Sequence, residues 1–288
     1  MKRIVILGCE NSHANSFLRY IRGKEEFSDV EVVGVHSDDT EAAQKLHTDF
    51  NVPVMADYTD AVGKVDGVVI TARHGDNHLR YARPYIESGV PMFIDKPITA
   101  TEEDAIELMR LLSENNIRIT GGSTLKQDAF VEQLKNEVKG NIGGKTLGGF
   151  VRAPYQPVND YGGFSFYAQH LIEIVLEIFG RFPLSVTARQ NGAQLHVLFH
   201  YEDYDCVGLF LDNNYVYYAC RMSEEGVNGK ILDGNDWSYK EFKEFYGLLE
   251  GKEKTITYEE FASPVFVINA IMRSLEGGCE EPVKRLTL

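Results

Sequence analysis

Arg3-Ile4-Val5-Ile6-Leu7-Gly8, close to the start of the chain, is a short apolar run that ends in a glycine. This pattern is typical of a strand that is buried on both faces of a parallel sheet. Similar apolar runs occupy residues 30–35, 66–71 and 92–94. Helix-like segments separate these runs, and such alternation indicates right-handed βαβ units. The first ~120 residues are therefore predicted to form a doubly wound parallel sheet with helices on both faces.

The segments predicted to be helical in this region are residues 15–21, 41–50, 79–88 and 101–115. Residues 52–54 are predicted to be extended, and residues 117–120 are predicted to end the series as a strand. Thr99 or Thr101 can cap the last helix, because a hydroxyl at this position accepts a hydrogen bond from the first turn.

The pattern changes from Gly121 onward. Helical spacing occurs at residues 129–138, 169–179, 239–249 and 263–276, and β-prone segments lie at residues 195–201, 206–211 and 215–221. Alternation of apolar and polar residues in these segments is typical of an antiparallel sheet with one covered face. We therefore expect an α/β protein of two domains: residues 1–121, and an α+β domain at residues 122–288 with a predominantly antiparallel open sheet.

Composition narrows the class of partner. The 288 residues contain 29 Lys and Arg against 43 Asp and Glu, which gives a formal net charge of −14. This acidity argues against nucleic acid or an anionic membrane as a partner, because both need a basic face. No apolar run approaches the ~18 residues of a membrane span. The four cysteines form no CxxC pair and are expected to be reduced thiols of a cytoplasmic protein.

Ligands of open α/β sheets bind at the carboxyl ends of the strands. The segments that follow the four apolar runs are residues 8–13, 36–39, 71–78 and 95–97. They contain four of the eight histidines: His13, His36, His74 and His78. We therefore expect the functional site of the first domain at this edge.

Several motifs have the order and spacing of a known family. Residues 94–98 read Ile-Asp-Lys-Pro-Ile, with His78 upstream. The further motifs are Asn141-Ile142-Gly143, Gly162-Gly163 followed by His170 and Ile178-Phe179-Gly180, and a C-terminal segment from Gly251 to Val283. Together they resemble the Gfo/Idh/MocA oxidoreductases, the glucose–fructose oxidoreductase and inositol dehydrogenase group, over nearly the whole chain.

The resemblance implies that the N-terminal domain is a Rossmann domain and that the protein is a dehydrogenase that uses NAD or NADP, with the choice between them open. It implies hydride transfer to or from a hydroxyl carbon of a sugar, a polyol or a related small molecule. Lys96 would bind the reacting oxygen and carry its proton, a role favoured when burial lowers the pKa of an ammonium. His170 would contact substrate hydroxyls or share the acid–base role. A homo-oligomer, dimer or tetramer, is also implied.

The resemblance places the cofactor against residues of the strand-end segments. These candidates are Gly8, Glu10, Asn11, Ser12, His13, Ser37, Asp38, Thr71, Arg73, His78 and Asp95. The fingerprint Gly-x-Gly-x-x-Gly keeps its first glycine only, since Glu10 and His13 occupy the other two positions. A carboxylate ~4 Å from a phosphate would cost about 4 kcal/mol at an effective dielectric constant of 20. Ser37 stands in the family's acidic position at the end of the second strand, and Asp38 follows it.

An alternative is a member of this family that has lost hydride transfer, as a metal-assisted hydrolase or lyase or as a ligand-sensing protein. Phe166 occupies the position of the family's Asp four residues before His170. Glu10 and His13 could hold a divalent metal together with His36, His74 or His170. No recognised metal motif fixes such a geometry, so the leading interpretation includes no metal site.

Overall fold

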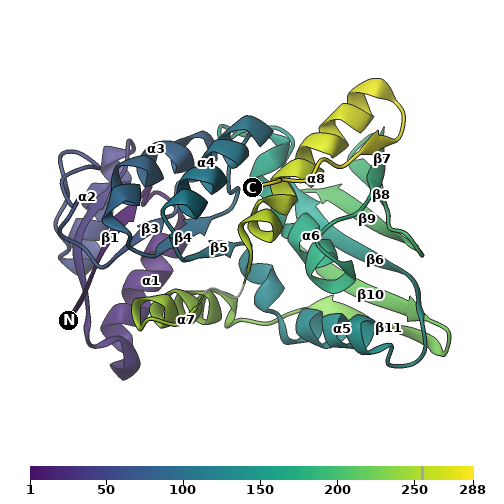
Figure 1. Ribbon diagram of the computed structural model, residues 1–288, viewed down its shortest axis with the longest axis horizontal. Helices are drawn as coiled ribbons and strands as arrows, with labels where there is room; N and C mark the ends of the chain where they lie inside the picture. Colours follow the sequence, from purple (N-terminus) through teal and green to yellow (C-terminus); the bar gives the residue numbers. More distant parts are fainter. Residues whose placement is uncertain (254–255) are drawn as a thin grey trace. The chain divides into compact units, whose positions relative to one another are not determined.

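The computed structural model describes residues 1–253 and 256–288 of the chain (Figure 1). The chain divides into two compact units. Unit 1 comprises Met1–Gly122, Ser238–Phe261 and Leu288. Unit 2 comprises Ser123–Trp237 and Ala262–Thr287. No helix within the described residues is both long and apolar enough to cross a membrane.

Unit 1 is built on a five-stranded sheet in which every neighbouring pair is parallel. The strands, in the order of the sheet, are β2 (Val30–His36), β1 (Lys2–Leu7), β3 (Gly67–Ile70), β4 (Met92–Asp95) and β5 (Ile119–Gly122). All four residues of β3 and of β4 are buried, because helices cover both faces of a doubly wound sheet. The predicted Rossmann sheet is confirmed, and the short piece at residues 52–54 reaches β2 through a parallel bridge between Val54 and Val35.

The helices of this sheet are α1 (Ser12–Gly23), α2 (Thr40–Phe50), α3 (Asp76–Ala82) and α4 (Glu102–Glu114). Two 3₁₀ turns, Glu25–Phe27 and Arg83–Ser88, accompany them. The single helix predicted at residues 79–88 is wrong in its second half, which is the turn Arg83–Ser88. Pro84 has no N–H to donate to a preceding turn, so the α-helix does not continue through it.

The division of the chain also differs from the predicted one. The first boundary follows Gly122, one residue beyond the expected end, but Ser238–Phe261 return to unit 1. This segment contains most of α7 (Trp237–Leu249), whose Phe242 and Phe245 are fully buried. The Phe242 ring lies 4.9 Å from the rings of both Phe17 and Phe27 in the unit 1 core.

Unit 2 contains a seven-stranded sheet. Its strands, in the order of the sheet, are β11 (Gly226–Leu232), β10 (Tyr217–Ser223), β6 (Thr146–Tyr155), β9 (Asp205–Asp212), β8 (Gln194–His200), β7 (Ser185–Asn191) and β12 (Glu281–Pro282). Only β6 and β9 pair in parallel, so the expected, mostly antiparallel sheet is confirmed.

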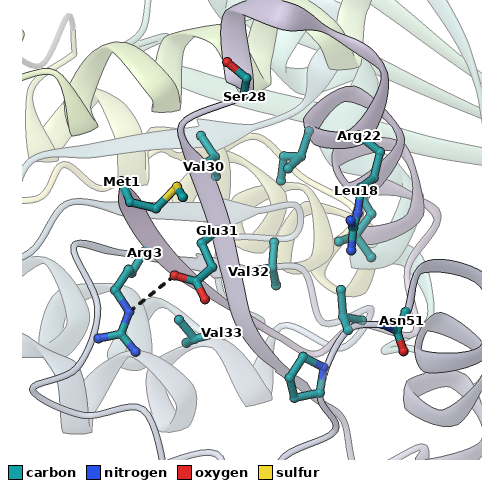
Figure 2. A pocket seen from close by; sticks show the side chains of 13 residues that line it. Met1, Arg3, Leu18, Arg22, Ser28, Val30, Glu31, Val32, Val33 and Asn51 are labelled. Carbon is teal, nitrogen blue, oxygen red and sulfur yellow. Dashed lines mark ion pairs between the residues drawn. The ribbon is translucent and has the colours of Figure 1, made fainter.

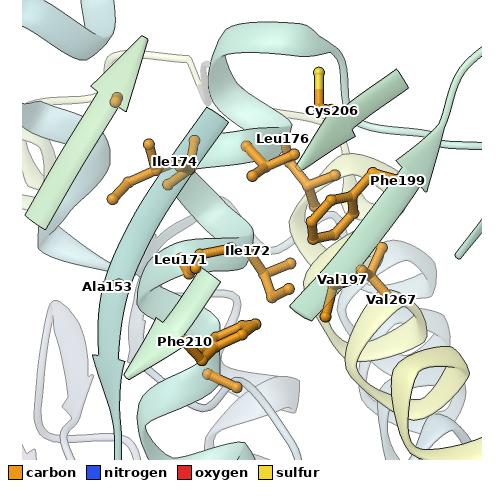
Figure 3. Packing of buried hydrophobic residues seen from close by; sticks show 14 of the residues in the cluster. Ala153, Leu171, Ile172, Ile174, Leu176, Val197, Phe199, Cys206, Phe210 and Val267 are labelled. Carbon is orange, nitrogen blue, oxygen red and sulfur yellow. The ribbon is translucent and has the colours of Figure 1, made fainter. Parts of the chain in front are cut away.

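The helices of unit 2 are α5 (Ala129–Gly140), α6 (Phe164–Phe179) and the part of α8 (Tyr258–Gly277) from Ala262 onward, with a 3₁₀ turn at Thr124–Gln127. Helix α6 is buried along almost its whole length. Figure 3 shows Leu171 and Ile172 of this helix among side chains of β8 and β9, including Phe199 and Phe210. This core fixes the position of His170, which lies on the same helix.

Candidate functional site

The turn after β1 is tied to the ends of both neighbouring strands. Gly8 has a φ of +68°, and a Cβ atom at this position would lie 2.4 Å from the Cβ of Ala72. Only glycine adopts this conformation so close to another backbone without strain. The Gly8 N–H donates to the His36 carbonyl at 2.8 Å, and the Thr71 hydroxyl donates to the Gly8 carbonyl at 3.0 Å. The tight turn of the fingerprint is therefore present although its other two glycines are replaced.

The next residues begin α1. Asn11 is its N-cap, and the Asn11 Oδ1 accepts a hydrogen bond from the His13 N–H at 3.2 Å. Ser12, the first residue of the helix, is exposed. The helix begins at the carboxyl edge of the sheet, and the positive end of a helix dipole favours a phosphate there.

Asp95, the last residue of β4, is the centre of a buried network at this edge. Its carboxylate lies 2.7 Å from His13 Nδ1 and accepts from Asn11 Nδ2 at 3.1 Å. The other carboxylate oxygen accepts from the Lys96 N–H at 2.7 Å. The side chain is wholly buried, so we assign Asp95 to positioning α1 and Lys96 and no longer to direct contact with a cofactor.

Lys96 follows Asp95 and is only 5% exposed. Burial lowers the pKa of Lys96 to about 8; the nearby Arg73 also lowers it, whereas the charge of Asp95 raises it. An amine with this pKa exchanges protons near neutral pH, as a general acid or base must. The peptide bond between Lys96 and Pro97 is cis. The geometry therefore supports the predicted acid–base role of Lys96.

His78 is fully buried in α3. Its Nε2 lies 2.9 Å from the Ala72 carbonyl, and its Nδ1 lies 3.1 Å from the Ile98 carbonyl. Burial lowers the pKa of His78. The imidazole thus joins the loop after β3 to the loop after β4, and we assign it to positioning in place of the expected cofactor contact, because a wholly buried ring presents no edge to a ligand.

Glu10 occupies the position of the second fingerprint glycine. Its Oε2 accepts a hydrogen bond from the Ser37 hydroxyl at 2.6 Å, and its Oε1 accepts from the Arg73 N–H at 2.9 Å. Asp38, the other acidic candidate near the end of β2, is bound to Arg80. The sequence named Glu10, Ser37 and Arg73 separately, and the structure brings them together.

The metal-assisted alternative gains no support from this arrangement. The Glu10 carboxylate is bound at the ends of β2 and β3, whereas His13 is bound to Asp95. His36 Nδ1 lies 3.4 Å from the Met55 carbonyl, and His74 Nδ1 lies 3.5 Å from Asp76. Across residues 1–253 and 256–288, no three His, Cys, Asp or Glu side chains are grouped to hold a metal ion.

His170 lies in unit 2 and is 7% exposed. Its Nδ1 is 2.7 Å from the Ser123 hydroxyl, and its ring lies edge to face with Tyr167 at 5.3 Å and with Tyr217 at 6.1 Å. Sequence reasoning had Tyr167 near His170 but did not place Ser123 or Tyr217 beside it. Tyr167 lies three residues before His170, and residues three apart share a helix face, whereas Ser123 and Tyr217 are brought there by tertiary structure alone.

Phe166 replaces the family's Asp and has aromatic surroundings. Its ring lies 5.0 Å from that of Tyr161 and 5.4 Å from that of Tyr167. The side chain is 8% exposed. No carboxylate stands at this position to share a proton with His170.

A pocket of about 690 Å³ lies along the edge strand β2 and the start of β1 (Figure 2). Arg3 and Glu31 form an ion pair of 3.8 Å in its lining. None of the candidate residues of the strand-end segments lines this pocket. It is therefore distinct from the site predicted at the carboxyl edge.

The strand-end residues fit the dinucleotide that the family resemblance implies. The Gly8 turn is present, α1 begins at the carboxyl edge of the sheet, and Ser12 is exposed in the first turn of α1. The charge of Glu10, which would oppose a phosphate, is bound at the ends of β2 and β3 by two hydrogen-bond donors.

Comparison with known proteins shows similarity of the first 120 residues to oxidoreductases. A family model described as an oxidoreductase family with an NAD-binding Rossmann fold, Gfo/Idh/MocA, matches residues 2–123. The uncharacterized oxidoreductase YhhX of Escherichia coli K12 is 26% identical over 126 residues, which are 40% of this chain and 35% of YhhX. The match thus spans about a third of the length of that relative.

Solved structures resemble the whole chain. A putative myo-inositol dehydrogenase from Sinorhizobium meliloti 1021 superposes with a TM-score of 0.82 and 16% identity, covering 99% of this chain and 100% of that chain. The WlbA dehydrogenase from Chromobacterium violaceum, solved with NADH and UDP-GlcNAcA, has a TM-score of 0.81 and 14% identity, covering 98% and 96%. At these identities the likeness shows a shared fold.

Proposed function

We propose that this chain, whose residues 2–123 match the model of the Gfo/Idh/MocA family of NAD-binding oxidoreductases, carries out the reaction of such an oxidoreductase. The protein transfers a hydride between NAD or NADP and a hydroxyl-bearing carbon of a sugar, a polyol or a related small molecule. The nearly buried Lys96 at the end of β4, with its pKa lowered to about 8, is the observation that carries this proposal. One protein of the same fold is named a putative myo-inositol dehydrogenase, and another was solved with UDP-GlcNAcA; both support the substrate class.

In the direction of oxidation, the neutral Lys96 amine accepts the proton of the substrate hydroxyl while the hydride leaves the carbon. In the direction of reduction, the Lys96 ammonium returns that proton to the carbonyl oxygen. A nicotinamide dinucleotide held at the strand ends would supply or accept the hydride. The buried Asp95 stabilises the ammonium by its charge and fixes the Lys96 backbone through the hydrogen bond to its N–H.

We assign the cofactor-binding residues by their place at the strand ends. Gly8, Asn11 and Ser12, with the start of α1, hold the phosphates. Of the remaining candidates, Thr71 and Arg73 line the end of β3. His13, Asp95 and His78 position the loops around them, as their hydrogen bonds indicate.

We propose that His170 of unit 2 contacts substrate hydroxyls. Its ring nitrogen is oriented by Ser123, and the rings of Tyr167 and Tyr217 beside it offer apolar faces to the C–H groups of a sugar. No carboxylate occupies the Phe166 position, so Lys96 carries the proton in this proposal.

A homo-oligomer, dimer or tetramer, and a cytoplasmic location complete the proposal. Part of the sheet in unit 2 leaves apolar side chains exposed, among them Val207, Met222 and Val227. The four cysteines form no disulfide, as expected in a reducing compartment. Light scattering tests the oligomer, and a monomer mass at micromolar concentration would overturn it.

The experiment that tests the proposed function is a titration of the purified protein with NAD(H) and with NADP(H), followed by tryptophan fluorescence or calorimetry. We expect saturable binding of at least one dinucleotide with a Kd below ~1 mM, the upper end of ordinary Michaelis constants. The same protein should then produce reduced nicotinamide with a member of a panel of sugars and polyols. Failure of both dinucleotides to bind would overturn the proposed function.

A further inference from the structure

The Glu10 carboxylate is held by hydrogen bonds from the segments that follow two strands, β2 and β3. The Ser37 hydroxyl accepts a hydrogen bond from the Asp39 N–H at 3.0 Å, so its single proton is directed to Glu10 Oε2 at 2.6 Å. The Arg73 N–H, at the end of β3, donates to Glu10 Oε1 at 2.9 Å. Ser37 is 4% exposed, so this support is itself buried. Glu10 therefore holds its charge at a defined point beside the end of β2.

The other acidic side chains that follow β2 are engaged elsewhere. Asp38 is bound to Arg80, and Asp39 is the N-cap of α2, where its Oδ1 accepts from the Ala42 N–H at 3.0 Å. Ser37 itself is neutral. Glu10 is thus the carboxylate that the fold holds against the first residue beyond β2, although it belongs to the turn after β1.

In dinucleotide-binding domains an acidic residue hydrogen-bonds the ribose hydroxyls of the adenosine half, and a 2′-phosphate on that ribose needs a nearby Arg instead. A carboxylate offers about four lone-pair directions, and two of those of Glu10 are used by Ser37 and Arg73. The remaining two can accept two hydroxyl protons. A 2′-phosphate at the same point would meet a like charge.

Resting on the proposed function, we infer that Glu10 takes the place of the acidic residue missing at Ser37. Its carboxylate accepts the ribose hydroxyls of the adenosine half and makes the protein select NAD over NADP. The residue that departs most from the fingerprint is thereby a determinant of cofactor specificity.

Arg80 is the cation that could favour the opposite preference. Its guanidinium is bound to Asp38 and lies over the rings of Tyr81, at 4.7 Å, and Tyr58, at 5.5 Å. Its charge is balanced by a carboxylate in this arrangement, whereas the charge of Glu10 meets only neutral donors in its two hydrogen bonds. The balance of charge beside Ser37 therefore favours two hydroxyls over a phosphate.

The test is a calorimetric titration of the wild type, Glu10→Gln and Glu31→Gln with NAD⁺ and with NADP⁺. Glu31→Gln is the matched control, because it removes the same charge in the separate pocket of Figure 2. We expect the wild type to bind NAD⁺ at least tenfold more tightly than NADP⁺. Glu10→Gln should weaken NAD⁺ by about 10- to 100-fold, the usual effect of losing a charged acceptor, and should reduce the preference to about threefold or less.

Ser37→Asp in the Glu10→Gln background is a second variant that separates recognition from folding. It places a carboxylate at the end of β2 itself, and we expect it to restore the preference for NAD⁺. Thermal unfolding followed by circular dichroism checks that each variant is folded.

Three results would overturn the inference while leaving the proposed function intact: a wild-type preference for NADP⁺, an unchanged preference in Glu10→Gln, or tighter binding of both dinucleotides by Glu10→Gln. The last result would mean that Glu10 only repels the pyrophosphate. Absence of binding of either dinucleotide to the wild type would overturn the proposed function as well.

Discussion

The Lys96 amine lies in the fields of two opposite charges. Burial is the largest influence on the pKa of Lys96 and lowers it; Asp95, its neighbour in the chain, raises this pKa, whereas Arg73 lowers it. These three influences together bring the pKa to about 8, from an ordinary value of 10.5. The oxidation rate needs the neutral amine, so it should rise with pH and level off above about 8.

Removal of either charge should move this pH profile, in opposite directions. Arg73→Gln removes a cation, so the pKa of Lys96 rises and oxidation at pH 7 falls by a few fold, up to about tenfold. Asp95→Asn removes an anion, so the pKa falls and the rate reaches its plateau at lower pH. The measurement is kcat for oxidation between pH 6 and pH 10 (about the range in which amines with lowered pKa titrate).

The control for this pair is Arg83→Gln, which removes an exposed cation paired with Glu107. It should leave the profile in place. If Arg73→Gln and Asp95→Asn moved the pH profile in the same direction, general loss of structure would explain the change better than charge. The rise of the oxidation rate with pH could then not be assigned to Lys96.

For single residues, the sequence predicted which residues form the site better than it predicted the contacts of their side chains. Lys96 followed from its motif, and its burial agrees with the role expected of it. The expected problem of Glu10 was a charge beside the phosphates. The structure binds that charge to Ser37 and the Arg73 N–H, and a hydrogen bond between residues 27 positions apart cannot be read from spacing.

The start of α4 shows what local chemistry determines at the scale of an element. Thr101 is its N-cap, and the Thr101 hydroxyl accepts from the Asp104 N–H at 3.1 Å. The sequence left Thr99 and Thr101 as alternatives. Thr99 is instead buried, and its hydroxyl donates to the Thr101 carbonyl.

Thr101→Ala should lower the free energy of unfolding by about 1 kcal/mol, because it leaves an N–H of the first turn without its acceptor. Thr101→Ser keeps the hydroxyl and should change the stability by a few tenths of that amount at most. Urea unfolding of both variants at neutral pH provides the measurement. An equal loss in the two variants would show that the methyl group, and not the cap, is responsible.

Strand β6 shows where element prediction failed. The predicted strands of the second domain begin only at residue 195, although β6 joins β9 and β10 inside the sheet. A Cβ on Gly149 would lie 2.0 Å from the ring of Phe179, so the glycine serves close packing of α6 on the strand. Only the tertiary contact distinguishes such a glycine from one in a turn.

At the scale of the whole molecule, the sequence predicted two domains and their sheets but not the path of the chain between them. The apolar stripe of α7 predicts that one face of the helix is buried, but it does not indicate in which domain core. Phe242 and Phe245 enter the core of unit 1, so a helix late in the chain completes the first domain. The shape and volume of the unit 1 core determine that α7 packs there, and the periodicity of the sequence predicts neither of them.

The net charge of −14 is a property of this scale too, and it has little bearing on the site. The reacting region of unit 1 depends on a few charges: the buried Asp95 and Lys96, and the half-buried Glu10, which hydrogen bonds hold in place. Their arrangement supports proton transfer at Lys96.

The most direct measurement compares turnover and dinucleotide affinity in the wild type, Lys96→Met and the exposed control Lys139→Met. Methionine is unbranched like lysine and fills much of the same space, but it is one atom shorter and has no amine. We predict that Lys96→Met lowers kcat by about 10²- to 10⁴-fold, the usual contribution of a general acid or base, with the Kd for the dinucleotide within about threefold of the wild type. The control should keep both values. Unchanged turnover in Lys96→Met would contradict the account.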